Sequence, residues 1–137
     1  GQAAAVTTSG NPDIQLILRG GASGPNYDAK KVAKAVSMLE TSQQPVSVMI
    51  DCSHGNSAKD HNRQPGVLED VTAQVAGGNR AIHAVMLESF LKAGSQAFPA
   101  PLENLQYGVS ITDACLDWEN TEASLRKAHE AIAPRFA

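Results

Sequence analysis

Three short apolar runs organise the chain, and each run stops at polar or turn-forming residues. The runs occupy residues 14–18, 46–50 and 81–87. Aliphatic and β-branched residues at successive positions are typical of strands that are covered on both faces. An ionisable side chain follows each run directly, and the three are Arg19, Asp51 and Glu88. We therefore expect the chemistry of this protein at the carboxyl ends of strands.

Apolar residues recur at helical spacing between and after these runs. The pattern covers residues 28–40 and 64–76 and resumes near residue 120, which predicts amphipathic helices. Asn26 or Asp28 can cap the first helix, and Pro65 fits the first turn of the second. Residues 92–107 follow neither period, so we expect a long loop there that covers a site.

Strands that alternate with helices predict a parallel sheet with crossover connections, and hence the α/β class. Side chains of mixed size on one strand face, with polar groups at the carboxyl ends, are typical of a (β/α)8 TIM barrel. Ile82, Ala84, Met86 and Glu88 are expected to share such a face. About three βα units are present, too few to close a barrel. We therefore expect either an open sheet or part of a longer barrel.

The composition fits one globular domain, with 42% hydrophobic and 18% charged positions among 137 residues. A net charge of −3 argues against nucleic acid as the main partner. Every apolar run is far shorter than the roughly 20 residues that cross a bilayer, so we expect no membrane contact. A single pair of cysteines, Cys52 and Cys115, is no disulfide framework and suggests reduced thiols in the cytoplasm.

His54, Glu88 and Asp113 are candidate metal ligands, because each ends or follows a predicted strand. One imidazole and two carboxylates suit a divalent Mn, Fe, Co or Zn ion. Taken separately, the residues leave plainer alternatives open: a turn histidine bonded to the backbone, and two carboxylates that cap turns. Arg19 has the forked guanidinium that binds phosphate or carboxylate, but it could equally form a salt bridge with Asp51 or Glu88.

The remaining polar and aromatic side chains are expected to be structural. Cys52 and Cys115 resemble small packed hydrophobes more than ligands. His83 should point towards the helices, and Trp118 should pack at the foot of the last helix. His61 and His129 are expected to be exposed.

Five ordered motifs resemble the C-terminal part of the type I 3-deoxy-D-arabino-heptulosonate 7-phosphate (DAHP) synthases. They are Ile-Leu-Arg-Gly-Gly at 17–21, Pro-Asn-Tyr at 25–27, Met-Ile-Asp-Cys-Ser-His-Gly-Asn-Ser at 49–57, Val-Met-Leu-Glu-Ser at 85–89, and Tyr-Gly-Val-Ser-Ile-Thr-Asp-Ala-Cys at 107–115 with Trp118 and Glu119. Because the motifs keep their order over essentially the whole chain, the resemblance is far more specific than any one of them.

The resemblance implies a metal-dependent (β/α)8 barrel that condenses phosphoenolpyruvate with erythrose 4-phosphate and releases phosphate. This reaction is the first step of the shikimate pathway to aromatic amino acids. His54, Glu88 and Asp113 match three of the family's four metal ligands. Arg19 matches an arginine that binds phosphoenolpyruvate, and His54 also lies beside that substrate in the family. A divalent ion can polarise an aldehyde or activate water, and an arginine can neutralise the charge of an enol phosphate.

The same resemblance identifies what the sequence lacks. The family's fourth ligand, a cysteine on an early strand, and its Lys-Pro-Arg-Thr substrate segment have no counterpart here. Cys52 stands where relatives usually carry an aromatic residue, so we do not assign it as the missing ligand. The chain should therefore be inactive alone and should associate with itself or with the missing N-terminal half of the barrel.

We expect one partial domain over residues 1–137. Residues 1–13, with a weak strand at 3–8, would be the tail of an inserted hairpin that binds effectors in feedback-inhibited members, with Val6 a candidate contact. Residues 14–137 would be the last βα units of the barrel.

Two other classes of protein stay open from the residues alone. One is an open-sheet domain that binds a phosphate ligand through Arg19 and the Gly20-Gly21 pair. The other is a metal-dependent hydrolase with Asp51, His54 and Glu88 around an activated water.

Overall fold

The computed structural model of the chain describes residues 1–136. Its strands and α-helices alternate along the sequence, which confirms the predicted α/β class. They are β1 (Leu16–Leu18), α1 (Ala29–Thr41), β2 (Val48–Asp51), α2 (Gln64–Ala76), β3 (Ile82–Met86) and α3 (Trp118–Ile132). Short 3-10 helices cover His61–Arg63, Leu102–Asn104 and Ala133–Arg135.

The three strands form one parallel sheet in the order β1-β2-β3, with β2 in the centre. Leu18 lies opposite Ile50, and Asp51 lies opposite Met86. The carboxyl ends of all three strands therefore meet at one edge of the sheet. This is the geometry that the three ionisable strand ends predicted.

An irregularity in the pairing of β2 with β3 changes the faces of β3. Val48 lies opposite Ile82, but the next residue, Met49, lies opposite Ala84, so His83 forms a bulge. The sequence predicted Ile82 on the face of Ala84, whereas the structure buries Ile82 in the core with Val48. A bulge inserts one residue and reverses the alternation of side chains on one side of it.

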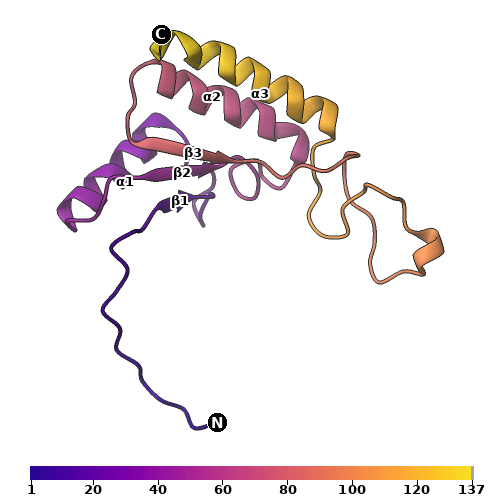
Figure 1. The fold of residues 1–137 in the computed structure, drawn as a ribbon, viewed down its shortest axis with the longest axis horizontal. Coiled ribbons are helices and arrows are strands. Elements are labelled where there is room, and N and C mark those ends of the chain that lie inside the picture. Colours follow the sequence, from indigo (N-terminus) through magenta and orange to yellow (C-terminus); the bar gives the residue numbers. More distant parts are fainter. Residues whose placement is uncertain (137) are drawn as a thin grey trace.

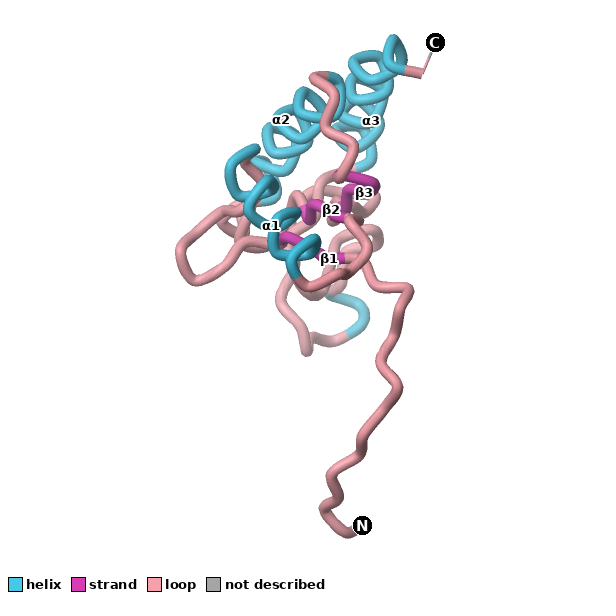
Figure 2. Tube along the Cα trace, turned by 90° about the vertical axis from the view of Figure 1, so that its left-hand side faces the viewer, coloured by secondary structure: helices cyan, strands magenta, loops and turns pink. Residues whose placement is uncertain are grey.

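The helices lie on one face of the sheet, with α2 and α3 side by side (Figures 1 and 2). Apolar positions of the strands, of α1 and of α2 form a single core between sheet and helices. Its buried members are Leu18, Val32, Ala35, Leu39, Val48, Ile50, Cys52, Val67, Leu68, Val71 and Ile82. Removing this apolar surface from water is the main force that holds the helices against the strands.

The opposite face of the sheet carries no helix in residues 1–136. Ile17 is 50% exposed there, and its strand neighbour Met49 is partly exposed.

On the helix side, an apolar groove of about 350 Å³ remains between β3, α2 and α3, with His83 among its lining residues. The position of His83 agrees with its predicted orientation towards the helices.

The ends of the helices follow from local capping. The Asp28 carboxylate accepts a hydrogen bond from the Lys31 N–H at 3.1 Å and caps α1. Asp117 caps α3 in the same way, so this helix begins at Trp118, slightly before the predicted start. Trp118 is 57% exposed, and the prediction that it packs was wrong. Its place directly after the cap leaves its side chain on the solvent side of the first turn.

The segment between β3 and α3 forms a long excursion (Figure 1) that contains only the 3-10 helix Leu102–Asn104. The Gln96 side chain holds its two arms together, because it donates to the carbonyls of Gln106 and Val109, both at 2.9 Å. Residues 109–113, which precede and include Asp113, form no strand, and Ser110 makes an isolated bridge with Ser95. The prediction of a long loop over 92–107 is confirmed.

Residues 1–13 lie outside the sheet and extend away from it (Figure 1). The structure contains no strand at residues 3–8, and Val6 is 82% exposed. In the part of the chain that the structure describes, no helix has the length and apolar character needed to span a bilayer.

Candidate metal site

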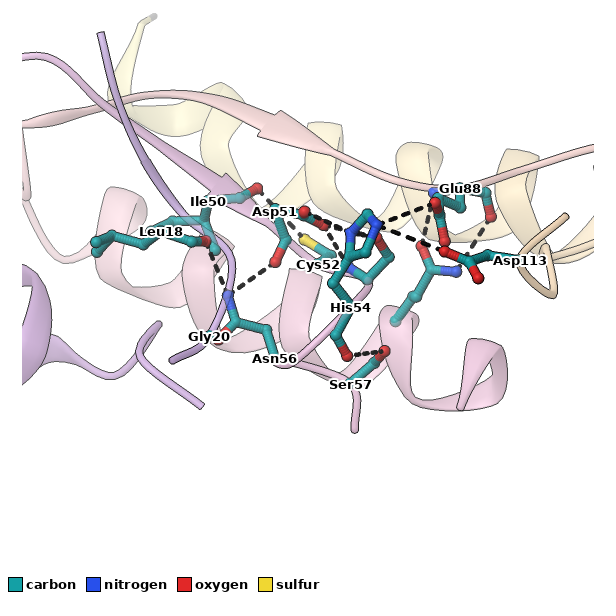
Figure 3. Close-up of polar contacts among 12 residues, drawn as sticks. Leu18, Gly20, Ile50, Asp51, Cys52, His54, Asn56, Ser57, Glu88 and Asp113 are labelled. Carbon is teal, nitrogen blue, oxygen red and sulfur yellow. Dashed lines mark hydrogen bonds and ion pairs between the residues drawn. The ribbon is translucent and has the colours of Figure 1, made fainter. Parts of the chain in front are cut away.

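Three predicted ligands meet at the carboxyl edge of the sheet (Figure 3). His54 Nε2 lies 3.5 Å from Glu88 Oε1 and 3.6 Å from Asp113 Oδ2. One potential ligand atom from each residue falls within 4.8 Å of the other two. Glu88 and His54 are mostly buried, whereas the Asp113 side chain is 59% exposed. The structure therefore brings together all three members of the predicted metal-binding set.

The imidazole of His54 is held from behind by its own turn. Its Nδ1 lies 2.7 Å from Asp51 Oδ2 and 2.7 Å from Ser53 Oγ. Asp51 is buried, and its second oxygen, Oδ1, accepts from the N–H and the hydroxyl of Ser53. A carboxylate at Nδ1 favours the tautomer that leaves Nε2 unprotonated and free to bind a cation. The local sequence Asp-x-x-His thus orients the ring towards Glu88 and Asp113.

The turn that carries His54 has an unusual backbone. His54, Ala58 and Lys59 have positive φ angles of 47°, 54° and 61°. Non-glycine residues adopt this region at a cost and do so mainly where the surroundings impose it. Here the Lys59 N–H donates to the His54 carbonyl at 2.7 Å and closes the turn.

Asn56 joins this turn to the end of β1. Its buried side-chain Nδ2 donates to the carbonyls of Leu18 and Asp51 at 2.9 and 2.8 Å (Figure 3). Its Oδ1 accepts from the Asn26 N–H at 2.8 Å. The Asn26 side chain in turn accepts from the Gly20 N–H at 2.7 Å. Two asparagines therefore satisfy backbone groups that the short strands leave without a partner.

Glu88 and Asp113 are held by the chain that follows β3. The buried amide of Gln64 bonds both the N–H and the carbonyl of Glu88. The Leu116 N–H also donates to the Glu88 carbonyl at 2.9 Å, and the Phe90 N–H donates to the Leu116 carbonyl at 2.8 Å. These backbone bonds bring the loop that carries Asp113 back to the end of β3.

A cavity of about 30 Å³ lies between the three ligands. It exceeds the roughly 10–15 Å³ that a water molecule needs, so a small ion fits. Lys59, His61 and Gln64 also line it. His61 was predicted to be exposed, but it is half-buried in this wall because the 3-10 helix His61–Arg63 turns it towards the site. The local signal for this turn is Asp60, whose side chain caps the 3-10 helix by accepting a hydrogen bond from the Asn62 N–H at 3.0 Å.

Arg19 is the predicted site residue that does not line this cavity. It follows β1 at the same edge of the sheet, and its side chain is exposed. Its carbonyl accepts a hydrogen bond from the Gly55 N–H at 3.0 Å, which places the backbone of Arg19 beside the turn of His54. The predicted salt-bridge alternative finds no support, because residues 1–136 contain no ion pair between Arg19 and Asp51 or Glu88 at up to 4.0 Å.

The cysteines near the site remain thiols. Burial raises the pKa of Cys52 to about 12, and the charge of Asp51 adds to the effect. Burial also raises the pKa of Cys115, with further contributions from Glu88 and Asp113. Neither sulfur belongs to the group of potential ligand atoms found in residues 1–136, which agrees with the prediction that the two cysteines pack rather than bind a metal.

The arrangement suits a divalent cation and excludes one alternative role of Asp51. A nitrogen and two carboxylates are a ligand set for Mn, Fe, Co or Zn. The hydrolase alternative placed Asp51 beside the activated water. In the structure both of its carboxylate oxygens are engaged by Ser53 and His54 within the interior.

Comparison with known proteins agrees with the motifs. Residues 2–126 match the DAHP synthetase I family. A putative phospho-2-dehydro-3-deoxyheptonate aldolase of Schizosaccharomyces pombe is 50% identical over 136 residues, which are 98% of this chain and 37% of that protein. The Tyr-sensitive phospho-2-dehydro-3-deoxyheptonate aldolase of Escherichia coli is 48% identical over 132 residues, or 96% of this chain and 37% of that protein.

The fold comparison gives the same result. The structure of phospho-2-dehydro-3-deoxyheptonate aldolase from Francisella tularensis SCHU S4 matches with a TM-score of 0.85 at 44% identity. The match covers 92% of this chain and 36% of that one, so the chain spans little more than a third of the length of these relatives. Sequence and fold agree over nearly all of its residues, and the chain belongs to the DAHP synthetase I family.

Proposed function

We propose that the protein containing this chain is a DAHP synthase. It would condense phosphoenolpyruvate, erythrose 4-phosphate and water to DAHP and phosphate, the first step of the shikimate pathway, in the cytoplasm. The observation that carries this proposal is the meeting of His54, Glu88 and Asp113 at one edge of the sheet. Family membership supports it, because the relatives named above are enzymes of this type.

The three ligands would hold a divalent Mn, Fe, Co or Zn ion. Such an ion supplies a Lewis acid that polarises a carbonyl oxygen or activates water. The chain's own contribution is orientation: Asp51 fixes the His54 ring at 2.7 Å, and Nε2 faces both carboxylates. His54 would also border the phosphoenolpyruvate site, since it lines the cavity between the strand ends.

Arg19 would bind the phosphate of phosphoenolpyruvate. Its guanidinium carries a permanent positive charge and a planar fork of donors that matches phosphate. The Gly55–Arg19 hydrogen bond keeps the residue beside the His54 turn, while the exposed side chain has no ion-pair partner at up to 4.0 Å within residues 1–136. Two anionic substrates repel each other, and a fixed cation at this edge would help to hold them together.

The chain would act as the last βα units of a (β/α)8 barrel. The uncovered sheet face with Ile17 would then point into the barrel, and the free edge of β1 would pair with the missing N-terminal half. The fourth metal ligand and the Lys-Pro-Arg-Thr segment would come from that half, so the chain alone should not turn over substrate. Residues 1–13, with Val6, would belong to a regulatory hairpin, and homo-oligomers are expected.

The test compares His54→Ala with His129→Ala in the intact protein that contains this chain. His129 lies exposed on α3, away from the ligand set, and is a matched control. With Mn²⁺, phosphoenolpyruvate and erythrose 4-phosphate supplied, His54→Ala should lose both phosphate release and tight Mn²⁺ binding, because it removes one of the ligands. His129→Ala should retain both. Full activity in His54→Ala would refute the proposal.

A further inference from the structure

Gln64 has an unusual environment for a glutamine. It is the first residue of α2, yet its side chain is completely buried and lines the cavity between the ligands. Burying an amide is unfavourable unless its donor and acceptor groups are satisfied. Both groups of Gln64 are satisfied by one residue, Glu88, and both bonds go to the main chain of Glu88 rather than to its carboxylate.

The two bonds replace the pairing that the sheet no longer provides. The last backbone bond between β2 and the end of β3 runs from the Cys52 N–H to the Met86 carbonyl at 2.8 Å. Two residues further on, the Glu88 N–H donates to Gln64 Oε1 at 2.8 Å, and Gln64 Nε2 donates to the Glu88 carbonyl at 3.1 Å. The Gln64 side-chain amide thus takes the place of a neighbouring strand and pairs with the Glu88 main chain beyond the end of β2.

The same carbonyl also connects Glu88 to the third ligand. The Leu116 N–H donates to the Glu88 carbonyl at 2.9 Å, and Asp113 lies three residues before Leu116. Gln64 and Leu116 therefore meet at a single acceptor. A shift of the Glu88 backbone would move the Glu88 carboxylate and the loop of Asp113 together, whereas His54 is held separately by Asp51.

We infer that Gln64 is a positioning residue that sets the affinity and geometry of the divalent metal site. Its amide bonds the main chain of Glu88 and none of the three ligand side chains; it acts by holding the backbone from which the Glu88 carboxylate reaches towards His54 Nε2 at 3.5 Å. Groups that orient metal ligands typically change affinity about 10–100-fold when removed. The inference rests on the proposed function, because it assumes that the ligand set binds a metal.

The experiment uses Gln64→Met, Gln64→Glu and a control, Gln74→Met, in the intact protein. Methionine nearly preserves the volume of glutamine but makes neither hydrogen bond. Glutamate retains an acceptor for the Glu88 N–H but loses the donor to its carbonyl. Gln74 lies on the same helix and donates to the Tyr27 carbonyl at 2.8 Å, outside the cavity. It therefore controls for the loss of an amide that supports the backbone.

Three quantities are measured on metal-free protein: the thermal unfolding midpoint, Mn²⁺ affinity by calorimetric titration, and the visible spectrum after Co²⁺ loading. We expect Gln64→Met to weaken Mn²⁺ binding about 10–100-fold and to alter the Co²⁺ spectrum. Gln64→Glu should alter the Co²⁺ spectrum as well. Gln74→Met should leave affinity and spectrum unchanged, even where it lowers the unfolding midpoint.

The His54→Ala variant distinguishes a failure of the Gln64 inference from a failure of the proposed metal site. If His54→Ala binds Mn²⁺ as tightly as the natural protein, the metal site itself is refuted. If His54→Ala loses binding while both Gln64 variants keep the natural affinity and spectrum, the positioning role of Gln64 is refuted and the metal site stands. If Gln64→Met fails to fold, the Co²⁺ spectrum of Gln64→Glu decides. An altered spectrum supports the positioning role of Gln64, and an unchanged spectrum refutes it.

Discussion

Gly20 is the position where a single added carbon should disturb both the fold and the site. It lies between the end of β1 and the turn of His54, with a φ of +84°. A Cβ placed on it would lie 2.6 Å from both Cα and C of Gly55 and 2.9 Å from the Asn56 N. All three are backbone atoms, which cannot rotate away as a flexible side chain can.

The cost of Gly20→Ala has two parts. An L-residue in the left-handed region loses about 1–2 kcal/mol. Restoring an ordinary contact of 3.4 Å requires the two loops to separate by about 0.8 Å, and forcing such a shift in a packed site typically costs about 1–3 kcal/mol. Together these give a destabilisation of about 2–5 kcal/mol. For an intact protein as long as the relatives, of which 136 residues are 37%, an unfolding entropy of about 2.1 cal/mol/K per residue gives about 1.3 °C per kcal/mol, so the unfolding midpoint should fall by about 3–6 °C.

Gly21→Ala is the matched control for this change. It is the next residue, its φ is not positive, and an added Cβ meets no atom within 4 Å. We expect Gly21→Ala to retain the natural midpoint and Mn²⁺ affinity, and Gly20→Ala to lower both, because Gly55 adjoins His54. The assay is thermal unfolding of the intact protein followed by Mn²⁺ titration. Equal midpoints for the two variants would refute the argument that the contact between Gly20 and Gly55 is close.

Two further predictions concern buried groups beside the site. Asn56→Asp removes the donors to the Leu18 and Asp51 carbonyls and buries a charge, so it should destabilise the protein by at least about 3 kcal/mol; an unchanged midpoint in urea would contradict this. At pH 8, iodoacetamide should modify Cys115 before Cys52, because Cys52 is buried and its pKa is raised to about 12, so that it stays protonated. Peptide mass mapping after partial labelling measures the order, and labelling of Cys52 first in folded protein would refute it.

Features that follow from the local sequence pattern were predicted correctly. The helix expected at residues 64–76 occupies Gln64–Ala76, because apolar spacing, a proline in the first turn and a glycine pair at the end all agree there. The meeting of His54 and Glu88 was also predictable, since parallel strands must end at the same edge of a sheet. Asp113 follows no strand in the structure and is brought to them by the Leu116–Glu88 backbone bond.

The groups that orient the ligands were not predictable in the same way. Gln64 looks like an ordinary first-turn residue, and its amide acquires a role only through Glu88, 24 positions away. His61 and Trp118 were misplaced for a related reason: the 3-10 turn before α2 and the Asp117 cap each shift where one side chain points. The bulge at His83 depends on register, which alternation along one strand does not reveal.

At the carboxyl edge of the sheet, side-chain amides form hydrogen bonds with the main chain. Asn26 and Asn56 bind main-chain groups beside β1 and β2, and Gln64 does so after β3. A carboxamide carries no net charge and does not titrate in ordinary buffers. Salt therefore has little effect on these hydrogen bonds, and acid does not protonate these amides. The hydrogen bonds that hold the Glu88 main chain and, through Leu116, the loop of Asp113 should therefore keep their geometry as pH or salt changes, whereas His54 depends on the ionisable Asp51 carboxylate at 2.7 Å.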